Sequence, residues 1–203
     1  MSRPTPDPFV DPAADAELHE QTVSSRVLHR GRTMTFRVDT IERPDGSRHD
    51  REIVGHPGAV AIVAIDAEDR ILLVRQYRTA AARALLEIPA GTLDVDPATG
   101  TVEDPDQAAP RELEEETGVR AAAWRKLGAF WTAPGFATEL MHLYLATGLR
   151  PAHGDRLTPD DDEALQLVRV PLAEALAAAE DGRIVDAKSI VGLLRVARLA
   201  DRT

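Results

Sequence analysis

The sequence predicts an α/β fold, and three observations indicate it. Residues 34–38 alternate apolar and polar side chains, which is typical of a half-buried strand. Residues 58–65 form a continuous apolar run that suits a central buried strand. Helical patterns follow at residues 104–117, 171–180 and 186–200. Strands and helices are interspersed and no repeat occurs in the sequence, so we expect one α/β domain behind a smaller N-terminal β region.

The first half of the chain is expected to be rich in strands. Pro44, Asp45, Gly46 and Ser47 form a turn signal, after which residues 51–54 return as the next strand. Residues 66–70 turn the chain again, between the apolar run at 58–65 and a strand at 71–77.

The second half begins with the helix at residues 104–117. Asp104 suits the N-cap, Pro105 the first helical position and Gly118 the C-terminal stop. Pro110 is expected to bend this helix or delay its start. Further strands are expected at residues 123–131, 140–146 and 164–170, with a long polar loop at 147–162.

Composition excludes several classes of protein. The 203 residues include 24 basic and 34 acidic side chains, a net charge of −10 that would repel a polyanion, so nucleic-acid binding as the main role is disfavoured. There is no cysteine, hence no disulfide framework and no thiol catalysis. No apolar run reaches about 18 residues, so no membrane span is expected. Residues 1–20 lack the pattern of a signal peptide, and we expect a disordered tail on a soluble, cytoplasmic protein.

The acidic face of the helix at 104–117 is the most informative feature. Glu112, Glu115 and Glu116 are spaced three and four residues apart, so they project from one face. Hard oxygen ligands of this kind suit Mg²⁺, which takes the rest of its shell from water and substrate phosphates. The alternative is a solvated acidic face on which Arg111 pairs with Glu115.

This helix resembles the Nudix box. Glu103 is followed after seven residues by Arg-Glu-Leu-Glu-Glu-Glu-Thr-Gly-Val at 111–119, and the opening glycine of the box matches Gly91. Eleven residues separate Gly91 from Glu103 where the family has five, which indicates a loop insertion around residues 94–100. The resemblance covers roughly residues 22–198. It implies the Nudix α/β/α sandwich with a mixed sheet, plus a small N-terminal antiparallel sheet.

The resemblance also implies a domain plan and a narrower branch. Residues 1–20 would be the tail, 21–57 a dimerising β region and 58–203 the Nudix hydrolase domain. Val-Arg-Gln-Tyr-Arg at 74–78, Leu-Leu-Glu-Ile-Pro-Ala-Gly at 85–91 and Thr-Ala-Pro-Gly-Phe at 132–136 are similar to the ADP-ribose pyrophosphatase branch. Membership would imply Mg²⁺-dependent hydrolysis of ADP-ribose to AMP and ribose 5-phosphate, with Mn²⁺ as a possible substitute. Two alternatives stay open: hydrolysis of another nucleoside diphosphate sugar, and a Nudix-like regulator that binds ADP-ribose without cutting it.

The resemblance assigns a role to individual residues. The metal ligands it implies are the carbonyl of Ala90 and the side chains of Glu112, Glu115, Glu116 and Glu163, and the four glutamates are also the expected catalytic groups. Glu163, at the end of the acidic run 159–163, would orient or deprotonate the attacking water, with Asp160, Asp161 and Asp162 as alternatives. The substrate contacts it implies are Arg51, Glu52, Arg78, Thr92 and Glu139. Glu103 and Arg111 would form a structural ion pair, and the N-terminal strands would pair across the two-fold axis of a homodimer.

Overall fold

The structure is a computed structural model that describes residues 9, 12–152, 157 and 164–200. The chain divides into two compact units: Met1–His56 with Gly135–Thr138, and Pro57–Pro134 with Glu139–Thr203. The sequence placed a boundary after residue 57 but did not indicate that residues 135–138 belong with the first unit. None of the described helices is long and apolar enough to cross a membrane.

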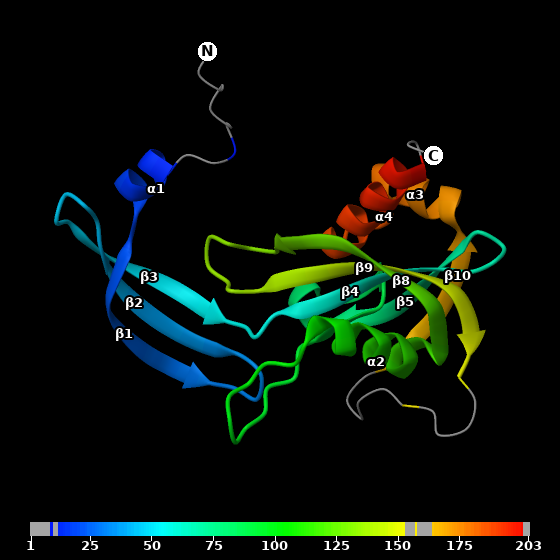
Figure 1. Cartoon of the computed structure of the whole chain (residues 1–203), viewed down its shortest axis with the longest axis horizontal. Helices are drawn as coiled ribbons and strands as arrows, with labels where there is room; N and C mark the ends of the chain where they lie inside the picture. The colour runs from blue at the N-terminus through cyan, green and yellow to red at the C-terminus, as the bar shows by residue number, and fades with distance from the viewer. Residues whose placement is uncertain (1–8, 10–11, 153–156, 158–163, 201–203) are drawn as a thin grey trace, which may run out of the picture. The chain divides into compact units, whose positions relative to one another are not determined.

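The first unit contains an antiparallel sheet with the order β1-β2-β3 (Figure 1). Its strands are β1 (Gln21–Arg30), β2 (Thr35–Glu42) and β3 (Arg48–Gly55). The predicted turn joins β2 to β3, with Gly46 at φ 82° and the Ser47 amide donating to Asp45 Oδ1 at 2.9 Å. This confirms the small antiparallel sheet.

The expectation of disorder throughout residues 1–20 is wrong for one stretch, because α1 (Pro12–Leu18) is a helix. Three of its seven residues are alanines, which have the highest helix propensity, and a proline opens it. The prolines that suggested disorder all lie at or before the first position of this helix.

The described residues of the second unit form a seven-stranded sheet with the order β10-β5-β4-β9-β8, in which β6 pairs with β5 and β7 pairs with β4. Central β4 lies parallel to β9 and antiparallel to β5, so the sheet is mixed. The strands are β4 (Ala59–Ile65), β5 (Arg70–Arg78), β6 (Arg83–Glu87), β7 (Ala90–Thr92), β8 (Val119–Trp131), β9 (Leu140–Pro151) and β10 (Gln166–Pro171). A short 3₁₀ turn, η1 (Thr79–Ala81), joins β5 to β6.

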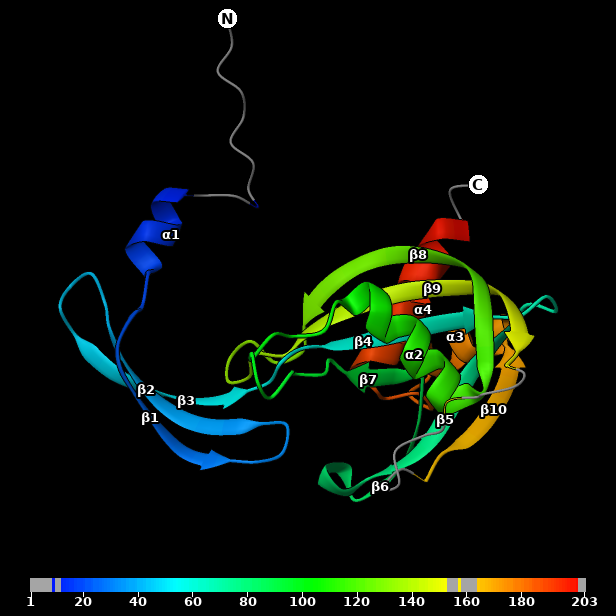
Figure 2. The same ribbon diagram turned by 60° about the horizontal axis from the view of Figure 1, so that its bottom comes forward.

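Helices cover both faces of this sheet (Figures 1 and 2). α2 (Pro105–Thr117) lies on one face, and α3 (Leu172–Glu180) and α4 (Ala187–Ala200) lie on the other. Successive side chains of β4 alternate between the two cores: Val60 and Ile62 pack with Leu113 of α2, whereas Ala61 and Val63 pack with Leu193 of α4. A strand buried on both faces explains the continuous apolar run, and the predicted sandwich is confirmed.

Local signals set the ends of α2. Asp104 accepts a hydrogen bond from the Asp106 amide at 3.0 Å, and Gly118 ends the helix at φ 68° with its amide donating to the Glu114 carbonyl. Pro110 lies inside the helix and does not delay its start. Its side chain is exposed, so the carbonyl that loses an amide donor lies on the solvent side, where water can replace that donor.

The polar loop predicted at 147–162 begins later than expected. β9 continues to Pro151, and β8 begins at Val119 instead of residue 123. The two strands pair from Trp131↔Leu140 to Val119↔Pro151, so the hydrogen bonds of the ladder override a polar, glycine-containing sequence. Gly148 adopts φ 67°, which a glycine accommodates inside a strand.

Candidate active site

Two carboxylates of α2 lie against the short strand β7. Glu116 Oε2 accepts a hydrogen bond from the amide of Ala90 at 3.0 Å. The carboxylate of Glu112 lies in the space that a side chain at position 91 would fill, since a Cβ there would come within 1.9 Å of Glu112 Cδ. Both glutamates are buried. A side chain at position 91 would therefore displace the Glu112 carboxylate, and α2 and β7 together bring two acids to one piece of backbone.

Arg111 holds the remaining acids of this face. Its guanidinium binds Glu103 at 2.7 Å, Glu115 at 2.8 Å and Glu112 at 2.9 Å. Hydrogen bonding to Arg111 lowers the pKa of Glu103, and the same bonds raise the pKa of Arg111. The expected pair of Glu103 with Arg111 forms, and the pairing of Arg111 with Glu115 forms as well.

The insertion before α2 closes on itself. The Gly100 amide donates to the Asp96 carbonyl at 2.8 Å, and the Asp96 side chain accepts from the Ala98 amide at 2.8 Å. The Glu103 amide then donates to the Asp94 carbonyl at 2.8 Å, so the chain leaves the insertion next to where it entered. The extra residues therefore leave Glu103 within reach of Arg111.

The donor set at β7 fits a divalent cation, because carboxylate and carbonyl oxygens are hard ligands. Among the described residues, no three His, Cys, Asp or Glu side chains are arranged to hold a metal ion, so the ligand set of Glu112, Glu115 and Glu116 stays a prediction. Glu115 binds Arg111 at 2.8 Å, and Glu116 accepts a hydrogen bond from the Ala90 amide at 3.0 Å. Arg111 with four carboxylates (Glu103, Glu112, Glu115 and Glu116) carries a formal charge of 1 − 4 = −3, an excess that a hard divalent ion would reduce.

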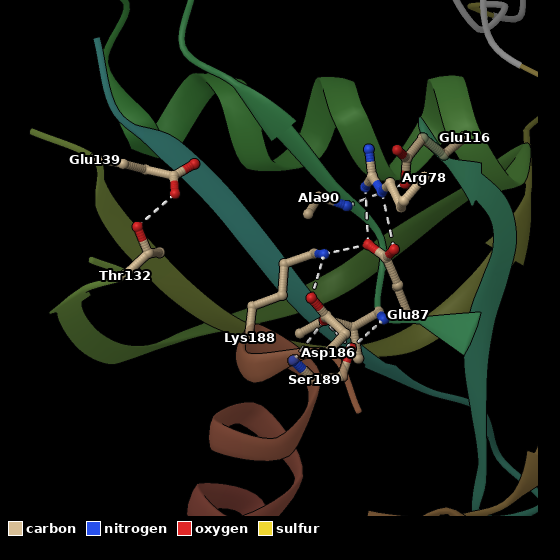
Figure 3. A network of polar contacts seen from close by, with 10 residues as sticks. Arg78, Glu87, Ala90, Glu116, Thr132, Glu139, Asp186, Lys188 and Ser189 are labelled. Carbon is tan, nitrogen blue, oxygen red and sulfur yellow. Dashed lines mark hydrogen bonds and ion pairs between the residues drawn. The ribbon is translucent and has the colours of Figure 1, made fainter. Parts of the chain in front are cut away.

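Arg78, at the end of β5, belongs to a second network of charges that adjoins the acidic face at Glu116 (Figure 3). Its Nε and Nη2 atoms donate to the two carboxylate oxygens of Glu87 at 2.9 and 2.8 Å. Burial alone would raise the pKa of Glu87, but the hydrogen bonds from Arg78 and the charge of Lys188 outweigh it and hold that pKa below its ordinary value. The hydrogen bond with Glu87 also raises the pKa of Arg78, which therefore stays cationic.

The other residues expected to contact substrate lie at several places. Thr92 ends β7, one residue from Gly91, and pairs with Ala59 of β4. Glu139 Oε2 accepts a hydrogen bond from Thr132 Oγ1 at 2.5 Å, beside the start of β9 (Figure 3). Arg51 and Glu52 lie on β3 in the first unit, where Arg51 Nε donates to Glu20 Oε2 at 2.9 Å. Glu163 and its alternatives Asp160, Asp161 and Asp162 lie outside the described residues.

Comparison with known proteins gives two matching domain families. The NUDIX domain model matches residues 55–190, two thirds of the chain, and a model described as the nucleoside diphosphate sugar hydrolase N-terminal domain matches residues 20–54. The chain belongs to the Nudix family. The Nudix match covers β7 and α2, which carry the acidic site.

Relatives of this Nudix chain carry different names at similar identity. The methanol dehydrogenase activator of Bacillus methanolicus is 41% identical over 174 residues, which are 86% of this chain and 90% of that protein. The ADP-ribose pyrophosphatase of Bacillus subtilis (strain 168) is 40% identical over 172 residues, 85% of this chain and 89% of the relative. A crystal structure of an ADP compounds hydrolase superposes with a TM-score of 0.75 and 27% identity, covering 91% of this chain and 96% of the other.

The sequence assigned no role to four residues of this second network: Glu87, which lies in the stretch 85–91, and Asp186, Lys188 and Ser189. Glu87 follows Leu85 and Leu86 and precedes Ile88, and a lone acid in an apolar strand needs a charged partner. Asp186 directly precedes α4 and accepts from the Ser189 amide at 3.0 Å, as an N-cap residue does. Both signals are visible in the sequence, but the ion pair that Lys188 makes with Glu87 joins residues 101 positions apart.

Proposed function

We propose that this Nudix chain hydrolyses the diphosphate bond of ADP-ribose and releases AMP and ribose 5-phosphate. The observation that carries a metal-assisted reaction is the approach of Glu112 and Glu116 to the Ala90–Gly91 backbone. ADP-ribose is favoured because the Bacillus subtilis relative bears that activity in its name and the similar crystal structure is of an ADP compounds hydrolase.

Nudix hydrolases generally depend on a divalent metal ion, and we propose Mg²⁺ here, with Mn²⁺ as a substitute. Its ligands would be the Ala90 carbonyl and the carboxylates of Glu112, Glu115, Glu116 and Glu163. When bound, the ion supplies neutralisation of the diphosphate and activation of the attacking water. Glu115 would have to exchange Arg111 for the metal, or remain a support beside it.

The chain's own residues would bind the substrate and move the proton. Arg78 presents a cationic fork that suits phosphate oxygens, while Thr92 and Glu139 would contact the ribose side and Arg51 and Glu52 a further part of the ligand. Glu163 would accept a proton from the water as its oxygen bonds to one phosphorus. The bridging P–O bond then breaks, and the two monophosphates leave.

A homodimer is part of the proposal. β1 is an edge strand that is exposed at every position, and Val23, Val27 and Leu28 are among its exposed residues. Exposed apolar edge strands tend to pair with another chain. A cytoplasmic location and the absence of nucleic-acid or membrane partners stay predictions.

A second candidate is hydrolysis of another nucleoside diphosphate sugar, which the description of the N-terminal family model favours. A non-catalytic ADP-ribose sensor is less well supported, because the box keeps Glu112, Glu115 and Glu116.

The test is product release from a panel of nucleoside diphosphate sugars, with and without Mg²⁺ and with excess EDTA. ADP-ribose should give AMP and ribose 5-phosphate, and activity should vanish with EDTA and return with Mg²⁺ or Mn²⁺. Glu116→Gln should lose turnover yet fold, since an amide oxygen can still accept from Ala90. Glu174→Gln, the same charge change at an exposed site, is the matched control. Undiminished hydrolysis in excess EDTA would contradict the metal mechanism. A higher kcat/KM for another nucleoside diphosphate sugar would contradict the substrate assignment.

A further inference from the structure

A chain of four alternating charges runs from the first turn of α4 to Arg78 (Figure 3). The ammonium group of Lys188 binds the Glu87 carboxylate and lies 3.0 Å from Asp186 Oδ1. Glu87 in turn holds Arg78 through two hydrogen bonds. Two cations and two anions give this network a net charge of zero.

Only one of the four charged side chains is substantially exposed. The exposed fraction is 1% for Glu87, 11% for Lys188 and 16% for Asp186, but 40% for Arg78. Glu87 uses two of the five N–H groups of the guanidinium, which leaves three for other acceptors. The buried groups therefore act on a ligand through Arg78.

The same turn of α4 also holds the backbone that leads to the acidic site. Ser189 Oγ donates to Asp186 Oδ2 at 2.6 Å and accepts from the Ile88 amide at 2.8 Å. Ile88 lies two residues before Ala90, whose amide binds Glu116. Ser189 thus holds this backbone through its hydroxyl group, and Lys188 contacts the same Asp186 carboxylate at its other oxygen.

We propose that Lys188 is a positioning residue that sets the charge beneath Arg78, so that Arg78 binds an anionic diphosphate while Glu87 holds it in place. This rests on the proposed function, in which Arg78 contacts the diphosphate. Without Lys188 the net charge of the network becomes −1, and Arg78 is the one cation of the network left to neutralise Glu87. Binding of an anionic substrate weakens, whereas the backbone at Ala90 stays held through Ser189.

The experiment compares steady-state KM and kcat of the full-length protein with four variants. Lys188→Met should raise KM by about fivefold or more and leave kcat within about twofold, the pattern expected when ground-state binding is lost. Adding Asp186→Asn restores a net charge of zero, and KM should return to within about twofold of wild type. Lys188→Arg keeps the charge and should stay close to wild type. Lys126→Met, which removes an exposed lysine paired with Asp106, is the matched control and should change neither constant.

An unchanged KM in Lys188→Met, or a double variant no better than the single one, would overturn the proposal and leave Lys188 a purely structural role. If the wild-type protein does not hydrolyse ADP-ribose, the proposed function is wrong. The role of Lys188 is then tested by measuring KM for the same variants with the nucleoside diphosphate sugar that is cleaved. The Nε–H resonance of Arg78, assigned with Arg78→Lys, tests it without turnover. Lys188→Met should move that resonance downfield, and an unchanged chemical shift would contradict the proposal. Lys188→Gln supplies the same charge change should the methionine variant not fold.

Discussion

Replacing Gly91 with alanine tests the geometry of the acidic site directly. The new Cβ would lie 1.9 Å from Cδ of Glu112 and 2.1 Å from each of its carboxylate oxygens. Real Cβ contacts essentially never fall below 3.0 Å, so Cδ of Glu112 must retreat by at least 3.0 − 1.9 = 1.1 Å. Gly91 has no positive φ, so the substitution adds a collision without backbone strain.

The effect on activity should exceed the effect on stability. A misplacement of about 1 Å at a reacting centre can cost about 10²-fold, so kcat/KM should fall by about 10²-fold or more. Overpacking costs about 1–3 kcal/mol. At about 2–4 °C per kcal/mol for a protein of this size, Tm should fall by about 2–12 °C. The variant therefore stays folded at 25 °C while its turnover collapses.

The assay is kcat/KM over a metal titration, with Tm measured on the same preparations. Adding Glu112→Asp to Gly91→Ala shortens the displaced side chain by one methylene, so it should recover Tm without recovering activity. Gly135→Ala, whose Cβ would meet nothing within 4 Å, should leave Tm unchanged. If Gly91→Ala keeps kcat/KM within about threefold and the same metal requirement, where a displaced ligand should cost about 10²-fold, Glu112 is not a metal ligand.

Three further predictions follow from the same structure. Glu163→Gln should lower kcat by about 10²–10⁴-fold with a much smaller change in KM, and a kcat within about threefold of wild type would move the base elsewhere. Light scattering at micromolar protein should give about twice the chain mass of 22.0 kDa, and Val27→Asp on β1 should lower the measured mass. A wild-type mass equal to that of one chain would contradict the proposed dimer. The pKa of Glu87 is depressed, so the ionised side chain stabilises the fold above its ordinary pKa of 4.5, and this stabilisation is lost as the pH falls below that value. In Glu87→Gln, Tm should be lower than that of wild type at pH 6 and should decline less between pH 5 and 3. A decline as large as that of wild type would refute this reasoning.

Local signals in the sequence predicted some elements closely. The bounds of α2 follow from Asp104, Pro105 and Gly118, each of which acts on backbone groups within a turn of itself. The extent of β8 and β9 could not be predicted in this way, because it depends on pairing between residues such as Val119 and Pro151, which lie far apart in the sequence. Composition predicted a loop from residue 147, whereas hydrogen bonds to β8 extend β9 as far as Pro151.

The acidic site shows the same division between local spacing and distant partners. Helical spacing predicted that Glu112 and Glu116 share a face, and the structure brings both to β7. Spacing alone did not predict that the Ala90 amide would bind Glu116 or that Glu112 would occupy the space beside Gly91. Both contacts come from a strand that lies more than twenty residues earlier in the sequence. The family resemblance predicted Arg78 as a substrate contact, but the side chain is held by Glu87, which in turn binds Lys188 about a hundred residues later. Sequence motifs thus predict which groups meet the substrate, whereas the buried partners that orient a group such as Arg78 become visible only when the strands and α4 pack together.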